Sequence, residues 1–366
     1  MNSGSFSDSL AFRLMLATVI LGMSIFFIIY FKDLLKPFVL AIMIWYLIKT
    51  IYNYIGRVKI MGKPLPRWLR GTLAIMFIVV CTQLTVDLVV SSLSDIVNNY
   101  AKYQRTLNTM LLDLGMTMGV ENLTDSVMEQ VSKLNLQGFL STTLSSLSTM
   151  IGNLVIIIIY IVFLLLEEVA FSNKLDLILR DSKKSERVRR ILEEIYDATN
   201  KYITLKTGVS LLTGGISYII LLIFGIDYAF LWAFLIFILN YIPYIGSLVA
   251  TLLPSIFAII QFGSLWSFLW VFISVEAVQI VVGNYIEPKV MGRSLNLSPL
   301  VVVLALSFWG YVWDLLGMFL SVPITSIMLI TLAQFPATRN IAILLTENGN
   351  LENVVVGSEK DEPNVA

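Results

Sequence analysis

The sequence contains no histidine and only one cysteine, Cys81. Disulfides within the chain, zinc sites with Cys and His ligands, and every catalytic triad that needs an imidazole are therefore excluded. Composition leaves a Ser-Lys or paired-Asp enzyme open, but the sequence has no motif for either and no GxxxxGK[ST] phosphate-binding loop. We therefore expect a protein that is not an enzyme and that holds no cofactor and no metal.

Charged residues are also scarce, at 14% of the chain, whereas soluble domains carry about a quarter. Hydrophobic residues make up 57%, and the mean hydropathy is +0.83. This composition places the chain among membrane proteins, with the lipid bilayer as its first partner. Because Lys and Arg balance Asp and Glu at 25 each, net charge predicts no nucleic-acid partner.

Long apolar runs predict an all-α fold, a polytopic membrane helix bundle of about eight hydrophobic segments. Two of these segments are interrupted by polar residues and predict broken or re-entrant helical hairpins, at 229–261 and 299–334. The sequence leaves open whether these two hairpins span the membrane fully. The uninterrupted runs are 11–30, 40–51, 71–90, 151–166, 208–224 and 265–282.

The placement of Lys and Arg predicts the orientation, because cytoplasmic loops carry an excess of these residues. Residues 52–70 hold five basic side chains and no acidic one, and residues 174–206 are rich in Lys and Arg. Both loops, and with them both termini, are expected to be cytoplasmic. Residues 91–148 should then lie outside, where apolar residues at helical spacing predict an amphipathic helix that packs on lipid or on protein.

These patterns divide the chain into successive parts. Residues 1–90 hold the first three spans and a basic loop, and 91–148 form the outer amphipathic segment. Residues 149–206 hold the fourth span and a charged cytoplasmic helix. Residues 207–335 form a transport core with the two broken hairpins, and 336–366 form a largely disordered cytoplasmic tail.

One apolar span, 265–282, carries an isolated carboxylate, Glu276, and continues into a polar stripe. Ionisable residues inside membrane spans are rare and usually face the bundle interior or a water-filled cavity. The stripe could bind a solute or an ion, or it could provide interhelical hydrogen bonds that only hold the bundle together. Its members are Glu276, Gln279, Gly283, Asn284, Glu287 and Pro288.

The breaks in the two hairpins are the other candidate pathway elements, since irregular backbone at membrane depth must be buried in protein or line a cavity. The first break holds Asn240, Pro243 and Gly246. In the second, Asp314 lies either at the interface, where it would be solvated, or at a gate within the membrane. The remaining candidates are Gly292, Gly317 and Pro323.

Several sequence blocks resemble the signatures of a known family: NYIPYIG (240–246), NYIEPKVMG (284–292), LSPL (297–300) and GMFLSVP (317–323). They are similar to those of the autoinducer-2 exporter family, the PerM-like permeases. The resemblance implies a homo-oligomeric, multi-pass permease of the bacterial inner membrane. It further implies export of a small furanone-type signalling molecule or, for some members, sodium/proton antiport.

The function expected from these observations is a permease or secondary transporter that exports a small polar solute, such as an autoinducer-2-like molecule. A monovalent cation (sodium)/proton antiporter is the first alternative, and a non-transporting membrane scaffold the second. The expected partners are thus a small-molecule or ion substrate, the bilayer and further copies of the chain. A scaffold has no need of a polar stripe inside an apolar span, which favours the two transport functions.

Overall fold

The computed structural model describes residues 10–118 except 58, 61 and 62, then 154–168, a few positions between 170 and 177, 183–291 and 296–351. Nearly all described residues are helical, which confirms the predicted all-α membrane bundle. A short antiparallel ribbon of β1 (Lys59–Ile60) and β2 (Lys63–Pro64) lies in the first basic loop. Six of the described helices are long and apolar enough to cross a membrane.

The N-terminal part consists of α1 (Leu10–Tyr30), α2 (Lys32–Arg57), α3 (Arg67–Asn98) and α4 (Tyr100–Met118). Helix α2 packs on α3, where Ala41 and Ala74 are fully buried and bring the two backbones close together. Isoleucines of the helical segment 154–168 cover this contact. The second span is therefore longer than its apolar stretch at 40–51 suggested.

The amphipathic stripe predicted in the outer segment begins within the last turns of α3 and continues through α4. Leu93 and Ile96 pack with Leu231, while Tyr103 packs edge-on against Phe257. The stripe is thus covered by protein along the part that the structure describes. Residues 119–153, which hold the rest of the predicted outer segment, lie outside the described residues.

Helix α7 (Lys183–Ile223) unites two parts that the sequence separated. The charged helix predicted to be cytoplasmic and the predicted fifth span form one continuous 41-residue helix, so the predicted boundary at 206/207 falls within it. The helix continues through Gly208, just after that position, and charge alone does not end a helix.

The first predicted hairpin is formed by α8 (Ala229–Leu239) and α9 (Ile245–Phe262), with a non-helical tip between them. Helix α10 (Leu265–Val281) packs along α9 and continues as a π-helical turn, Val282–Ile286, and then as α11 (Glu287–Met291). The polar stripe therefore leaves regular α-helical geometry midway, which the sequence pattern did not predict.

The second predicted hairpin is α12 (Pro299–Ala333), whose helix breaks at Trp313 and Asp314. It is followed by α13 (Arg339–Leu345), and the chain is described as far as Leu351. Residues 339–351 are thus folded, in contrast to the largely disordered tail predicted from residue 336. Residues 352–366 lie outside the described part.

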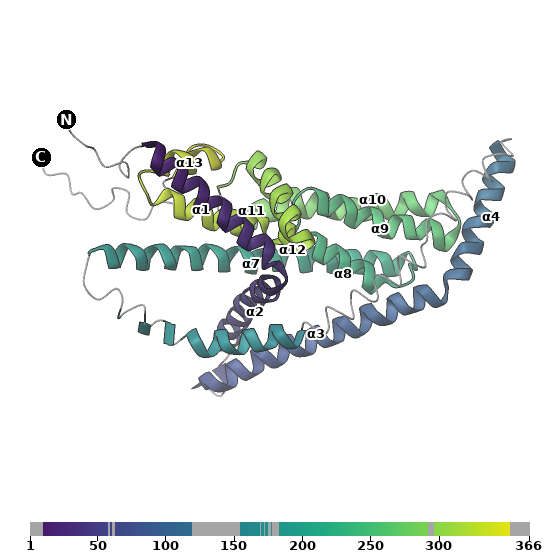
Figure 1. The fold of residues 1–366 in the computed structure, drawn as a ribbon. Coiled ribbons are helices and arrows are strands. Elements are labelled where there is room, and N and C mark those ends of the chain that lie inside the picture. The colour runs from purple at the N-terminus through teal and green to yellow at the C-terminus, as the bar shows by residue number, and fades with distance from the viewer. Residues whose placement is uncertain are drawn as a thin grey trace, which may run out of the picture.

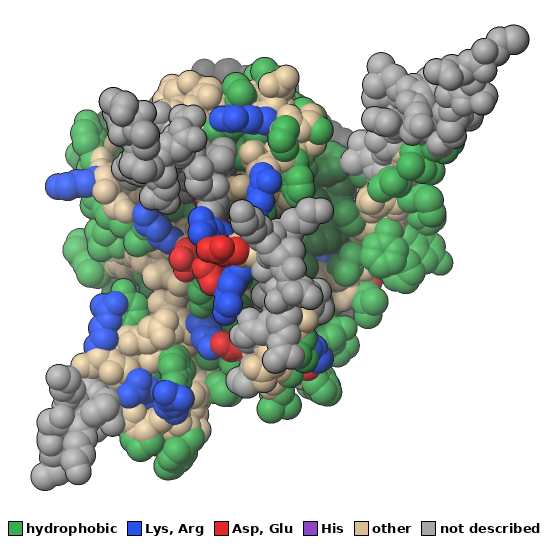
Figure 2. Space-filling model, turned by 90° about the vertical axis from the view of Figure 1, so that its left-hand side faces the viewer, with side chains coloured by type: hydrophobic (Ala, Val, Ile, Leu, Met, Phe, Trp, Pro, Cys, Tyr) green, Lys and Arg blue, Asp and Glu red, His purple; other side chains and the backbone are tan. Residues whose placement is uncertain are grey.

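The helices lie between two different ends of the molecule (Figure 1). We call one the basic end; it holds the start of α1, the start of α7 and α13. The other, the α4 end, holds α4 and the turns that join α7 to α8 and α9 to α10. On the basic end, Lys and Arg side chains are more abundant than Asp and Glu (Figure 2).

Candidate functional site

A cavity of about 600 Å³ lies where α7, the tip of the α8–α9 hairpin, the α10–α11 rod and α12 meet. Its volume falls within the range of about 300–1,000 Å³ that is usual for small-molecule sites. The cavity brings together most of the predicted pathway residues, from two separate stretches of the chain. These are Asn240, Pro243, Glu276, Gln279, Asn284, Glu287 and Pro288.

Helix α10 supplies two polar side chains that lack protein partners. Glu276 Oε2 and Gln279 Nε2 are both buried, and neither makes a hydrogen bond with any described residue. Buried polar atoms are nearly always hydrogen-bonded, so an orphaned pair within one turn of the same helix indicates a missing partner. One is a carboxylate oxygen and the other an amide donor, so together they can accept and donate hydrogen bonds to a polar solute.

The π-helical turn Val282–Ile286 carries the next part of the lining. Gly283 and Asn284 face the cavity from this turn, and Glu287 follows it. Such wide turns within α-helices are rare and occur frequently at functional sites. The turn rotates Glu287 about the axis of the continuous helix Leu265–Met291 relative to a regular α-helix. In this position Glu287 meets α7.

Glu287 forms an ion pair with Lys206, with 2.5 Å between Oε1 and Nζ. The side chains are only 22% and 6% exposed, so each compensates the charge that the other brings into a poorly hydrated site. Sequence reasoning missed Lys206, because the positive-inside rule grouped it with the basic loop. Its position two residues before the apolar run at 208–224 was the available signal.

The α8–α9 tip closes another side of the cavity. Asn240 donates a buried hydrogen bond from Nδ2 to Ser210 Oγ on α7 at 3.1 Å, which fixes the start of the tip. The turn then requires a positive φ of 61° at Tyr244. Gly246 is needed because a Cβ there would lie 1.9 Å from the carbonyl oxygen of Leu239. Gly246 therefore shapes the tip without lining the cavity.

The other predicted residues take different positions. Gly317 plays the same packing role in α12, where a Cβ would lie 1.8 Å from Trp309 O. Pro323 is buried beside Val322, which does line the cavity. Asp314 lies outside it, 69% exposed and paired with Lys36 at 2.8 Å. Gly292 lies outside the described residues.

At the basic end, residues near the C-terminus complete the cavity. Glu347 and Asn348 line it together with Asn296 and Leu297. Sequence reasoning missed both C-terminal residues, because the polar, acidic composition after residue 346 is typical of a solvated tail.

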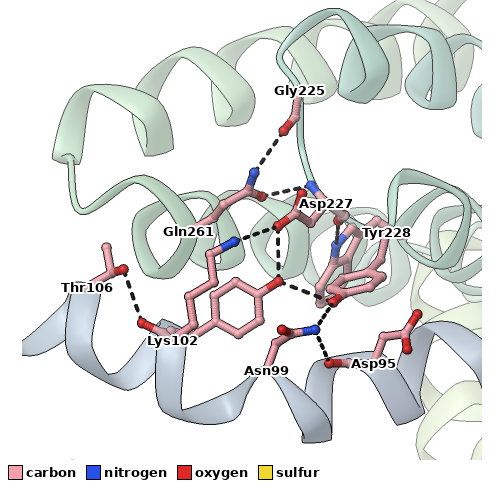
Figure 3. A network of polar contacts seen from close by, with 10 residues as sticks. Asp95, Asn99, Lys102, Thr106, Gly225, Asp227, Tyr228 and Gln261 are labelled. Atoms are coloured by element: carbon pink, nitrogen blue, oxygen red, sulfur yellow. Dashed lines mark hydrogen bonds and ion pairs between the residues drawn. The ribbon is translucent and has the colours of Figure 1, made fainter.

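A polar network ties the base of the α8–α9 hairpin to α4 (Figure 3). Tyr103 on α4 donates to Asp227 at 3.0 Å and lies 3.3 Å from the Tyr228 hydroxyl. Gln261, at the end of α9, accepts from the Asp227 backbone N–H and donates to Gly225 O, both at 2.8 Å. Burial, and the hydrogen bonds to Tyr228 and Asp227, raise the pKa of Tyr103 well above the ordinary tyrosine value.

The sequence of this chain matches the model of the AI-2E family of transporters over residues 14–337. The chain belongs to this family. It is 30% identical to the AI-2 transport protein TqsA of Escherichia coli over 318 residues, which cover 86% of this chain and 90% of that protein. A putative transport protein of Haemophilus influenzae is 32% identical, with the same coverage of 86% and 90%. The putative permease PerM of E. coli is 24% identical over 90% of this chain and 95% of its own length.

Membership makes the chain a transporter or permease and a multi-pass protein of the bacterial inner membrane. It confirms the family that the sequence blocks at 240–246, 284–292 and 317–323 had indicated. Those blocks coincide with the hairpin tip, with the π-helical turn and with the second arm of α12. The family signatures therefore fall on the parts of the chain that form or support the cavity.

Proposed function

We propose that this permease exports a small polar solute, of the kind of autoinducer-2, and that the solute binds in the cavity between α7, α8–α9 and α10–α11. The observation that carries the proposal is the unpartnered pair Glu276 Oε2 and Gln279 Nε2. Leaving both atoms buried without hydrogen bonds costs free energy that a scaffold protein would have no reason to retain. The name of the E. coli relative, an AI-2 transport protein, supports the same solute class.

A bound solute would replace the missing partners. Its hydroxyl groups would donate to Glu276 Oε2 and accept from Gln279 Nε2, while Asn240 and Asn284 offer further amide groups from the tip and from the π-helical turn. The Lys206–Glu287 pair is already compensated, so it adds polarity to the wall without a net charge. The described lining thus offers no unpaired basic side chain to an anionic solute, and its amide and carboxylate groups suit a polar solute that carries several hydrogen-bonding groups.

Export requires that the cavity open alternately to the two sides of the membrane, and we assign the basic end to the cytoplasm. Cysteine labelling tests the orientation in a Cys81→Ser background, because Cys81 is exposed on α3. An impermeant thiol reagent added to intact cells should modify a Gln104→Cys variant on α4. It should spare a Glu186→Cys variant at the start of α7, and the reverse pattern would overturn the assignment.

Transport itself is tested in inside-out membrane vesicles supplied with autoinducer-2. We expect uptake to depend on the protein, and Gln279→Ala to lower it about tenfold, since one lost hydrogen bond is worth about 1–1.5 kcal/mol. Glu276→Gln, which keeps a hydrogen-bonding group, should be tolerated far better than Glu276→Ala. Ser307→Ala is the control, because Ser307 on α12 is exposed, lies outside the cavity lining and donates its hydroxyl to Val303 O within its own helix. Uptake equal to that of vesicles without the protein would refute the proposed solute.

Sodium/proton antiport is the second candidate, favoured by one observation. Glu276 has a buried, unpartnered carboxylate oxygen within a membrane helix, and such a group can exchange a proton for a cation. Proteoliposomes with a pH-sensitive dye inside separate the two functions. Proton movement on imposing a sodium gradient, abolished by Glu276→Gln, would establish antiport; an unchanged internal pH would exclude it.

A further inference from the structure

The segment after α13 is a part of the cavity that the family match does not include. The family model ends at residue 337, whereas the cavity is also lined by Glu347 and Asn348. They follow α13, the helix that lies at the basic end of the molecule (Figure 1). The wall at this end is therefore built in part from sequence that lies beyond the matched family region.

This segment is held in place by hydrogen bonds to the chain just before α12. Ser298 donates its backbone N–H to Leu345 O at 3.0 Å, and Glu347 donates its own to Asn296 O at 3.3 Å. The Asn296 side chain donates from Nδ2 to Asn350 O at 2.6 Å. Together with a β-bridge between Leu297 and Thr346, these bonds pair the segment with 296–298. The backbone around Glu347 is thus fixed on both sides.

Buried side chains anchor the same segment against the bundle. Ala342 in α13 is fully buried, and Thr346 and Leu351 are 5% and 6% exposed. Leu351 belongs to the same hydrophobic cluster as Trp309 and Leu329 of α12. Glu347 and Asn348 lie between these anchors and are themselves exposed. An exposed loop held at both ends beside a cavity is suited to form its rim.

The charges of the lining give Glu347 a distinct role. Lys206 and Glu287 compensate each other inside, and Glu276 lies on α10 within the bundle. Glu347 makes no ion pair with any residue in the described part of the chain. A fixed charge at the entrance of a poorly hydrated cleft raises the local concentration of opposite charges and lowers that of like charges.

We infer that the C-terminal segment 346–351 forms the rim of the transport site, and that Glu347 is a specificity-determining residue that disfavours anionic solutes at the basic end. The role in transport rests on the proposed function, while the position of the rim rests on the hydrogen bonds and anchors above. A neutral solute passes this rim without penalty, whereas a phosphorylated or carboxylated one is repelled.

The charge of the rim can be measured without a transported solute. In a Cys81→Ser background, Asn284→Cys places a thiol in the cavity, and purified full-length protein is reacted with a cationic and an anionic methanethiosulfonate reagent. The ratio of the two rates reports the potential along the route to the cavity. Glu347→Lys should lower the cation-to-anion ratio at least about threefold, and Glu347→Gln should lower it by about half as much on a logarithmic scale.

Glu193→Lys is the matched control, since Glu193 is an exposed carboxylate on the basic-end part of α7 and does not line the cavity. This variant should leave the ratio unchanged. A purely structural role for the segment predicts a different result, in which both reagents react faster and their ratio stays constant. Asn296→Ala, which removes the bond to Asn350 O, shows what such loosening looks like.

The inference is overturned if Glu347→Lys changes the ratio no more than Glu193→Lys does. Should Glu347→Lys fail to fold, the smaller shift expected for Glu347→Gln decides the question. Labelling needs no solute, so the two proposals can fail separately. An unchanged ratio of labelling rates would refute the role of Glu347 at the rim and leave the export proposal intact. Conversely, if the vesicles take up no autoinducer-2, a shifted ratio of labelling rates would still support the role of Glu347 at the rim.

Discussion

In the α8–α9 hairpin the helix breaks at Tyr244, and in α12 it breaks at Asp314; both residues have positive φ, of 61° and 56°. A glycine follows closely in each case, Gly246 and Gly317. In each, the missing Cβ lets the carbonyl oxygen of the first arm approach to a distance that no side chain permits. Each second arm also contains a proline. The two hairpins thus turn by the same backbone device.

Their tips nevertheless have different surroundings. The first tip lies on the cavity through Ile242, Pro243 and Tyr244. The second tip carries Asp314 out to Lys36 near the start of α2, and α12 reaches the cavity only through its arms, at Val302 and Val322. A helix break within a membrane span therefore identifies a hairpin, but the neighbours of its tip decide whether the tip can touch a solute.

The largest expected difference concerns the ion pairs near the two hairpins. Removing one partner of the buried Lys206–Glu287 pair leaves an uncompensated charge and should cost about 3–5 kcal/mol. The Lys36–Asp314 pair is exposed, so its loss should cost about 0–1 kcal/mol. Thermal unfolding of Lys206→Met and Lys36→Met in detergent measures both. Equal losses would mean that the cavity wall is as well hydrated as the second tip.

Substitution of the two hairpin glycines, Gly246 and Gly317, should lower stability by similar amounts, whereas loss of the two ion pairs should not. Gly246→Ala and Gly317→Ala each force a backbone shift, for which about 1–3 kcal/mol or more is expected. Gly215→Ala on α7 is the control, because a Cβ there meets no atom within 4 Å. The same unfolding assay applies. If one of the two substitutions is as mild as Gly215→Ala, the hairpins do not share the device.

Substitutions at the two hairpin tips should affect export differently. Asn240→Ala removes an amide of the cavity and its bond to Ser210, and uptake into inside-out vesicles should fall about tenfold. Asp314→Asn keeps the shape of the second tip, and uptake should stay within about twofold, as expected for an exposed ion pair. Loss of uptake in Asp314→Asn with normal expression would make the second tip a gate.

Local pattern was enough to predict the breaks and one face of the cavity. Asn240–Gly246 interrupts an apolar run, and the spacing of Glu276 and Gln279 places them on one face of a helix. Both features could therefore be predicted without a tertiary structure. The role of Lys206 in the cavity could not be predicted in this way. Its partner Glu287 is 81 residues away and follows a π-helical turn that has no sequence signature. The polar, acidic composition of residues 346–351 likewise predicted disorder, but this segment is folded because it pairs with residues 296–298.

The smallest expected effect concerns the base of the first hairpin, which α4 holds through the hydrogen bond from Tyr103 to Asp227. Tyr103→Phe removes the hydroxyl that donates to Asp227 and should cost about 1 kcal/mol, because the ring keeps its packing on Phe257. The second hairpin is held at its base by backbone hydrogen bonds such as Ser298 N–H to Leu345 O, which a side-chain substitution leaves in place.

The pH dependence gives this prediction a distinct signature. The pKa of Tyr103 is raised in the folded protein, chiefly by burial, so the folded state holds its proton more tightly than the unfolded state does. The resulting stabilisation is complete below the unfolded-state pKa of about 10 and declines as the pH rises above it. Unfolding temperatures measured from pH 8 to 11 should therefore fall more steeply for the wild type than for Tyr103→Phe. Parallel curves would show that Tyr103 contributes packing alone, and the base of the first hairpin would then depend on Gln261 and its two bonds to the 225–227 turn.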